Sequence, residues 1–202
     1  MFFVGGSLLT EGNIGRCIQQ IKAETNKPVI IFPGSVMQVH ESADAILFLS
    51  LLSGRNPELL IGQHVLAAPR LSQMNLEIMP TAYLLVNGGK PTTASYISNT
   101  EPIPHNKPSI AACTALAGMY LGFSMLYLDS GSGAENPVSA KMIAAVRKTV
   151  DLPIIVGGGI RNAKQAQAAT QAGADIIVVG TAFEENSNLV HEIAQAVKGV
   201  GV

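Results

Sequence analysis

The sequence has no run of basic residues and almost no net charge. Its 202 residues contain 13 Lys and Arg against 14 Asp and Glu, so the formal charge at pH 7 is -1. A nucleic-acid surface owes its affinity to clustered Lys and Arg, and this composition argues against such a partner. Any anionic ligand must therefore be held by groups close to it.

Metal-binding spacings of cysteine and histidine are also lacking. Cys17 and Cys113 lie far apart, neither has a partner at CxxC or CxxH spacing, and the four histidines show no ligand spacing. We therefore assign no histidine to zinc or to catalysis. Each cysteine falls on the apolar side of a helical pattern, so we expect two buried free thiols. This usage, with no basic start of a signal peptide, predicts a cytoplasmic protein.

One segment, Ser109 to Leu128, has no charged residue. Its length approaches the roughly 18 to 20 residues of a transmembrane helix. Serine, threonine and glycine dilute its apolar character, and the break near Gly122 divides it. We expect a buried helix followed by a buried strand, Met125 to Leu128, and no transmembrane segment.

Short apolar runs alternate with helical patterns along the whole chain. Repeated βα units of this kind indicate a parallel sheet with helices outside it. The chain is long enough for one sizeable core, and we expect a single domain over residues 1–202. The expected strands are Phe2–Val4, Val29–Phe32, Ala45–Leu52, Ile78–Val86, Met125–Leu128, Pro153–Val156 and Ile176–Val179.

The seven expected strands leave two fold classes open. The first is a (βα)8 TIM-type barrel whose first βα unit is absent from this sequence, because a barrel short of one strand exposes two unpaired edges. The second is an open doubly wound sheet. Glycine turns after the last two strands favour the barrel. Residues 87–108 form a long irregular stretch, which predicts a lid, a binding segment or short helices.

Three glycine turns follow the last three expected strands. The first is Tyr127-Leu128-Asp129-Ser130-Gly131-Ser132-Gly133, the second is Val156-Gly157-Gly158-Gly159-Ile160, and the third is Val179-Gly180-Thr181-Ala182. Glycine permits positive φ, so backbone N–H groups can converge on an anion. Each turn precedes a helical pattern, the first of which is expected to begin at Pro137. Three such turns in succession predict a phosphate site, although glycine also serves any tight βα turn.

Together with Phe3-Val4-Gly5-Gly6-Ser7 and Arg161 after the second turn, these motifs resemble the geranylgeranylglyceryl phosphate synthase family. The order and spacing match over essentially the whole chain. The family also includes bacterial heptaprenylglyceryl phosphate synthases. The resemblance implies a (βα)8 barrel that joins a prenyl diphosphate, geranylgeranyl diphosphate above all, to the 3-hydroxyl of sn-glycerol 1-phosphate and releases diphosphate.

The resemblance also implies a set of site residues. The glycerol phosphate would be held by Tyr127, Leu128, Asp129, Ser130, Gly131, Ser132, Gly133, Gly158, Gly159, Gly180 and Thr181. Mg²⁺ is the implied cofactor, with Ser7 on the metal side. Family members carry a further metal-binding aspartate in an Asp-Pro-Asp-Lys-like stretch, and this sequence has no such stretch.

The residues themselves leave alternatives open for each role. Asp129 follows a strand and could accept the proton of the glycerol hydroxyl as a general base, or it could cap the glycine loop. Tyr127 could bond a substrate oxygen, or be a core residue with its hydroxyl at the rim. Ser7 could be a metal ligand or a turn serine. Thr181 could bind phosphate or cap the last turn, and Arg161 is expected to be a surface charge or ion pair.

Other functions and partners remain in view. A phosphosugar isomerase or aldolase on the same barrel, or a non-catalytic glycerol phosphate binder, are the alternatives to the prenyltransferase. Small residues at Ala111, Ala115, Gly118 and Gly122 would let another helix approach closely, so we place the interface of a homo-oligomer there. We also expect transient membrane contact during product release.

Overall fold

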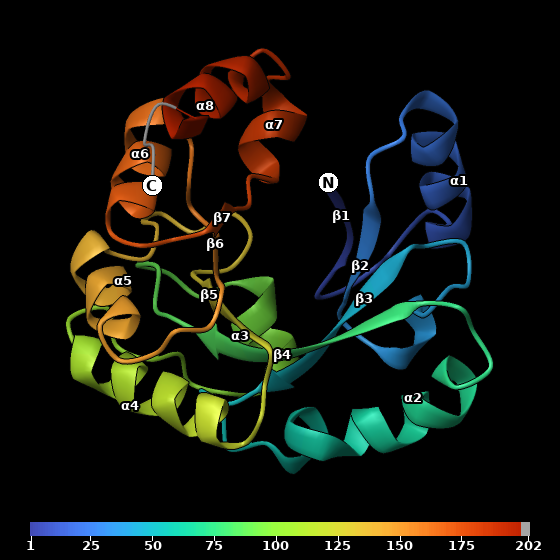
Figure 1. Ribbon diagram of the computed structural model, residues 1–202, viewed down its shortest axis with the longest axis horizontal. Helices are drawn as coiled ribbons and strands as arrows, with labels where there is room; N and C mark the ends of the chain where they lie inside the picture. The colour runs from blue at the N-terminus through green and yellow to red at the C-terminus, as the bar shows by residue number, and fades with distance from the viewer. Residues whose placement is uncertain (199–202) are drawn as a thin grey trace. The chain divides into compact units, whose positions relative to one another are not determined.

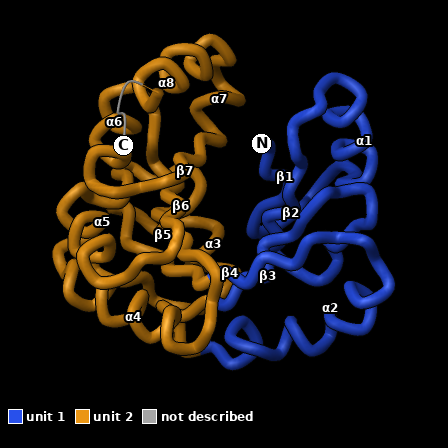
Figure 2. The backbone as a smooth tube through the Cα atoms, viewed as in Figure 1, with its two compact units in different colours: residues 1–50, 56–81 blue, residues 51–55, 82–202 orange. Residues whose placement is uncertain are grey.

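The chain divides into two compact units (Figure 2). Unit 1 comprises residues 1–50 and 56–81, and unit 2 comprises residues 51–55 and the chain from residue 82 onward. The computed structural model describes residues 1–198. Within that range seven strands are hydrogen-bonded in the order β1 to β7 and alternate with helices, which confirms the predicted α/β, TIM-type fold class. The single domain over residues 1–202 stays a prediction.

Unit 1 carries the first three parallel strands. The register pairs Phe2 with Val29 and Ile30 with Ala45. Ile18, Val29, Ile31 and other buried side chains form its apolar core. Its elements are β1 (Phe2–Gly6), α1 (Ile14–Glu24), β2 (Val29–Pro33), the 3-10 helix η1 (Val36–Gln38), β3 (Ala45–Leu51), the π-helix η2 (Glu58–Gly62) and α2 (Gln63–Leu71). Leu51, the last residue of β3, belongs to unit 2.

Unit 2 carries the remaining strands. Strand β4 (Glu77–Leu85) enters it at Ala82. The ends of β4 and β5 are joined by the Val86 N–H, which donates to the Asp129 carbonyl at 2.8 Å. The other elements are α3 (Thr93–Ser98), α4 (Pro108–Tyr120), β5 (Met125–Asp129), α5 (Ala140–Arg147), β6 (Ile154–Gly157), α6 (Ala163–Gln171), β7 (Ile176–Ile177), α7 (Thr181–Glu185) and α8 (Leu189–Lys198). Helices α4, α5, α6 and α8 follow one another around this unit (Figure 1).

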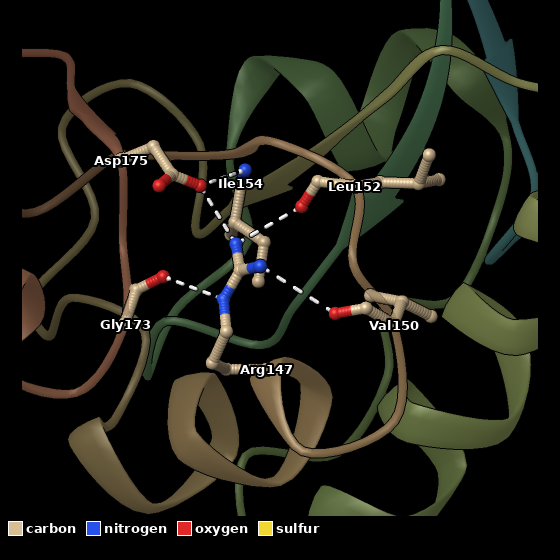
Figure 3. A network of polar contacts seen from close by, with 6 residues as sticks. All are labelled: Arg147, Val150, Leu152, Ile154, Gly173 and Asp175. Atoms are coloured by element: carbon tan, nitrogen blue, oxygen red, sulfur yellow. Dashed lines mark hydrogen bonds and ion pairs between the residues drawn. The ribbon is translucent and has the colours of Figure 1, made fainter.

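A network around Arg147 holds the N-terminal ends of β6 and β7 (Figure 3). The guanidinium donates to the carbonyls of Gly173, Val150 and Leu152 and forms an ion pair of 2.7 Å with Asp175. The same carboxylate oxygen accepts the Ile154 N–H at 2.7 Å. The network therefore ties the first residue of β6 to the residue before β7, at the opposite strand ends from the glycine turns.

Helix α4 corrects the predicted oligomer interface. Its small residues Ala111, Ala115 and Gly118 are buried, and a Cβ added to Gly118 would lie 3.0 Å from the Ala82 Cβ. These three residues thus pack against the strands of their own unit and cannot form the predicted oligomer interface, while Gly122, the fourth predicted position, is exposed. The outward face carries Tyr120, which is 77% exposed. Because α4 is apolar all round, periodicity could not indicate which face is buried.

The cysteines and one helix start also differ from expectation. Cys17 and Cys113 are free as predicted, but both are exposed, so the prediction of buried thiols is wrong. In α1 the core position next to Cys17 is taken by Ile18. Helix α5 begins at Ala140 rather than at Pro137, because the hydroxyl of Ser139 caps it by accepting the Met142 N–H.

Candidate active site

Asp129 is the last residue of β5 and is only 5% exposed. Oδ1 accepts the Gly131 N–H at 2.7 Å, and Oδ2 accepts the Tyr83 hydroxyl at 2.5 Å. Burial raises the pKa of the Asp129 carboxyl above its ordinary value, while these two hydrogen bonds to the charged form act to lower it. A buried carboxylate with a raised pKa is a candidate proton acceptor. Asp129 also caps the glycine loop, which is the alternative role expected from the sequence, and its role as a general base stays a prediction.

Two tyrosines pack beside this carboxylate. Tyr83 and Tyr127 contact edge to face, with ring centroids 5.5 Å apart and planes at 85°. Burial, followed by the charge of Asp129, raises the pKa of both hydroxyls well above the ordinary value, so both are neutral donors at any pH near 7. The hydroxyl of Tyr127 lies toward Gly157, where an added Cβ would meet it at 2.5 Å.

Sequence reasoning missed Tyr83. It lies within the expected strand Ile78–Val86, and none of the glycine motifs contains it. The available signal was a hydroxyl-bearing side chain two residues before the end of β4, in the otherwise apolar last part of that strand, residues 82–85. Because the carboxyl ends of neighbouring parallel strands lie at one edge of a sheet, that position predicts proximity to the end of β5.

The turns after β5 and β6 touch each other closely. Gly131, Gly133, Gly158 and Gly159 all have positive φ, from 69° to 86°. A Cβ on Gly158 would lie 2.5 Å from Asp129 Oδ1 and 2.6 Å from Gly131 N. Only glycine leaves room for this approach, and the use of these glycines to bind an anion stays a prediction.

The loop after β4 also reaches the first glycine turn. A Cβ on Gly131 would lie 2.6 Å from Oγ1 of Thr92, the residue that caps α3. The long irregular stretch 87–108 therefore carries a short helix and touches the candidate site. Of the alternatives left open for that stretch, a short helix is present, and its use as a binding segment stays a prediction.

The hydroxyl of Ser130 is a buried polar group of the site that lacks a hydrogen-bond partner among the described residues. Ser130 is 1% exposed, and its Oγ has no hydrogen-bond partner within residues 1–198. Buried polar groups are normally paired. A hydroxyl left over beside a glycine turn is thus available for a ligand oxygen.

The third turn meets the first through two hydroxyls. Oγ of Ser132 lies 3.1 Å from Oγ1 of Thr181, at the start of α7. Leu128, by contrast, is fully buried and its side chain belongs to the apolar core, so only its backbone faces the turn. Arg161 is exposed as expected and donates to the Ala134 carbonyl at 3.1 Å, which pins the loop after β5.

Ser7 belongs to unit 1 and lies just beyond β1. Mg²⁺ prefers several oxygen ligands, including carboxylates. Residues 1–198 contain no group of three or more His, Cys, Asp or Glu side chains that could hold a metal ion. One serine hydroxyl does not make such a site, so the described residues do not fit the predicted metal centre.

Comparisons with known proteins agree with the motifs. The PcrB family matches residues 1–198. The geranylgeranylglyceryl phosphate synthase of Spirosoma linguale is 55% identical over 197 residues, which are 98% of this chain and 79% of that protein. The enzyme of the same name from Thermococcus kodakarensis is 45% identical over 203 residues, which are 97% and 80% of the two chains.

A solved structure matches the fold. The crystal structure of (S)-3-O-geranylgeranylglyceryl phosphate synthase from Thermoplasma acidophilum, in complex with its substrate sn-glycerol-1-phosphate, has a TM-score of 0.92 and 40% sequence identity. The match covers 98% of this chain and 81% of that one. The family resemblance read from the motifs is thereby confirmed.

Proposed function

Because the chain belongs to the PcrB family, we propose that it transfers a prenyl group from a prenyl diphosphate to the 3-hydroxyl of sn-glycerol 1-phosphate. The relatives named above are geranylgeranylglyceryl phosphate synthases, so geranylgeranyl diphosphate is the proposed donor. The product is the ether lipid phosphate of archaeal-type membranes, and diphosphate is released.

The observation that carries this proposal is the buried carboxylate of Asp129 between two glycine turns. The raised pKa of Asp129 suits a base that takes a proton from a hydroxyl. As the glycerol O3 forms its bond to C1 of the prenyl group, the bond from C1 to the diphosphate oxygen breaks. The proton of the hydroxyl passes to Asp129, and the electron pair leaves with diphosphate.

We propose that the glycine turns form the binding site for glycerol phosphate. Ser130 offers a buried hydroxyl without a partner, and Ser132 and Thr181 bring two more hydroxyls together. Gly133, Gly158, Gly159 and Gly180 would contribute backbone N–H groups, while the N–H of Gly131 is already donated to Asp129 Oδ1 and holds the base. Tyr127 supports the site by packing against Tyr83, and we propose that its hydroxyl faces the bound substrate.

Magnesium dependence is the finer part of the proposal. Mg²⁺ supplies charge neutralisation for a diphosphate leaving group. Because residues 1–198 do not offer its ligand set, we assign no step to the ion and keep Ser7 as a proposed single ligand. Product formation in magnesium that disappears in EDTA would support the requirement.

The direct experiment measures product from labelled sn-glycerol 1-phosphate with prenyl diphosphates from farnesyl to heptaprenyl. We expect ether product with the highest kcat/KM for geranylgeranyl diphosphate, and parallel assays in magnesium and in EDTA test the metal requirement. The mirror-image acceptor, sn-glycerol 3-phosphate, is the matched control and should give little product. Binding of glycerol phosphate without any product would overturn the transferase in favour of a non-catalytic binder.

Location and assembly remain proposals. No helix within residues 1–198 is both long enough and apolar enough to cross a membrane. We propose a cytoplasmic enzyme that forms a homo-oligomer and touches a membrane only while it releases its lipid product. Light scattering gives the assembly, and flotation with vesicles in the presence of product tests the membrane contact.

A further inference from the structure

Tyr83 makes the shortest side-chain contact to the candidate base. Its hydroxyl donates to Asp129 Oδ2 at 2.5 Å, which lies at the short end for a hydrogen bond from a hydroxyl to a carboxylate. The tyrosine comes from β4 and the aspartate from β5, so the bond links the ends of two neighbouring strands. Tyr83 is 9% exposed and its ring is fixed against Tyr127. The donor is therefore held in place by packing.

The two oxygens of Asp129 are constrained in different ways. Gly131 N–H fixes Oδ1 from the loop, and Tyr83 fixes Oδ2 from the next strand. The titratable groups that face this carboxylate are Tyr83 from β4 and Tyr127 from its own strand, and both carry neutral hydroxyls. The turn after β6 contributes Gly158, which has no titratable side chain. Within residues 1–198, the groups that stabilise the negative charge of Asp129 are two hydrogen-bond donors, the Tyr83 hydroxyl and the Gly131 N–H.

We propose that Tyr83 is a positioning residue for the reaction: its hydroxyl aims the Asp129 carboxylate and keeps it deprotonated until the glycerol hydroxyl arrives. This inference rests on the proposed function. A carboxylate oxygen has two lone pairs, so Oδ2 can accept from Tyr83 and from the substrate together. During the step the proton of the glycerol hydroxyl passes to Asp129, while the Tyr83 proton stays on its own oxygen.

The pH dependence of kcat distinguishes a positioning role of Tyr83 from a purely structural one. In Tyr83→Phe the ring and its contact with Tyr127 remain, but the donor to Asp129 is lost. A hydrogen bond to a charged group contributes about 1.5 to 3 kcal/mol, and 1.36 kcal/mol corresponds to one pKa unit. The acid limb of the kcat profile should therefore move to higher pH by about one to two units.

The test compares pH profiles of kcat and KM for wild type, Tyr83→Phe and the surface control Tyr120→Phe. We expect Tyr83→Phe to lose about 10- to 100-fold in kcat on the acid side, to recover as the pH rises, and to keep its KM for glycerol phosphate. Tyr120 is 77% exposed, and its variant should follow the wild-type profile. A loss in Tyr83→Phe that is uniform across pH would overturn the proposal.

A second readout does not need turnover. The chain has four aspartates, Asp44, Asp129, Asp151 and Asp175, so ¹³C labelling of aspartate carboxyls gives four signals, and Asp129→Asn identifies the one of interest. We expect its titration midpoint to rise in Tyr83→Phe. A shifted midpoint without prenyl transfer would reject the proposed function alone, while prenyl transfer with an unshifted midpoint would reject the role of Tyr83 alone.

Incorporation of 3-fluorotyrosine at position 83 guards against loss of folding in the phenylalanine variant. The fluorinated hydroxyl is a stronger donor in nearly the same volume. The acid limb and the carboxyl midpoint should then move to lower pH, opposite to Tyr83→Phe. A shift in the same direction for both variants would contradict the proposal.

Discussion

The two units end their strands in glycine turns that a side chain caps, but the turns differ in the polar groups that they leave unpaired. In unit 1 the buried side chain of Gln38 closes the turns: Oε1 accepts from Gly6 N–H at 3.3 Å and from Gly34 N–H at 3.2 Å, and Nε2 donates to the Gly6 carbonyl at 2.8 Å. In unit 2 the Ser130 hydroxyl remains without a partner among the described residues. A side chain caps the turn in each unit, since Asp129 accepts the Gly131 N–H, but of these turns only that of unit 2 keeps a buried hydroxyl that no described residue pairs.

The opposite strand ends of the two units are alike. Asp44 precedes β3, accepts the Val29 N–H of β2 at 2.8 Å and pairs with Lys22 at 2.6 Å. Asp175 and Arg147 have the same relation to β6 and β7. Chemistry and stability therefore separate along the strands: the N-terminal ends hold the scaffold in both units, and the carboxyl ends differ where the proposed reaction occurs.

The sharpest test of this separation compares one aspartate from each end. Asp129→Asn should lower kcat by about 10²- to 10⁴-fold, because the amide cannot take up the proton. It should leave the affinity for glycerol phosphate nearly unchanged. Steady-state kinetics with isothermal titration of glycerol phosphate measures both.

The matched variant is Asp44→Asn, which removes a carboxylate at the scaffold end of unit 1. We expect its kcat to match the wild type. Equal losses of kcat and of glycerol phosphate affinity in Asp129→Asn would reject the general base, and a comparable loss of kcat in Asp44→Asn would reject the separation of roles.

The next largest effect is expected at the contact between two turns of unit 2. Gly158→Ala places a Cβ against Asp129 Oδ1 and Gly131 N, which displaces the base from its aligned position. A displacement of about 1 Å can cost about 100-fold in rate, and we expect a loss of that order in kcat/KM.

Gly122→Ala is the control for backbone strain. Gly122 has φ of 85°, close to the 78° of Gly158, but an added Cβ there meets nothing within 4 Å. Both variants should lose about 1 to 2 kcal/mol of stability from the left-handed backbone. Only Gly158→Ala should lose activity; similar kinetics for the two variants would show that the close contact has no functional role.

Gln38→Leu addresses the closed turns of unit 1. The variant leaves the N–H groups of Gly6 and Gly34 and the Gly6 carbonyl without their partner, so we expect a loss of about 1 to 3 kcal/mol in the free energy of unfolding. Gln73→Leu, at an exposed position of the same unit, should change it by no more than about 0.5 kcal/mol. Urea denaturation measures both. Equal stability of the two variants would mean that Gln38 does not hold these turns.

The sequence predicted the parts of the molecule that follow from local pattern. Apolar runs between helical patterns located all seven strands found within residues 1–198, and glycine spacing located the turns around Asp129. Local pattern could not show contacts between distant segments. Tyr83 lies 46 residues from Asp129, and no sequence feature near either residue indicates that the two are in contact.

The sequence also could not show which face of α4 is buried, for a related reason. Apolar residues occupy both sides of that helix, so the choice between Ala115 and Tyr120 as core positions depends on how closely the helix approaches its strands. Small residues permit that approach, and the distance between helix and sheet is a property of the packed unit. For the same reason Cys113 was expected to be buried, whereas it lies on the exposed face of the helix.

The smallest expected effect concerns the two scaffold ends in acid. The hydrogen bond from Lys22, and after it the Val29 N–H, hold the pKa of Asp44 below its ordinary value. A lowered folded pKa means that the stabilisation is present above the ordinary pKa of about 4 and is lost as the pH falls through the folded value. The side chains of Lys22 and Asp44 are 40% and 42% exposed, so the pair contributes no more than about 1 kcal/mol.

Urea denaturation of wild type and Asp44→Asn at neutral and acid pH tests this expectation. The wild type should be the more stable at pH 7, and the difference should vanish in acid, because the protonated carboxyl no longer attracts Lys22. Arg147 also donates to three backbone carbonyls, which do not titrate. These hydrogen bonds should therefore persist at an acid pH that has already broken the ion pair of Lys22 with Asp44. A difference between the two proteins that stays constant or grows toward acid would show that the charge of Asp44 does not hold β2 to β3.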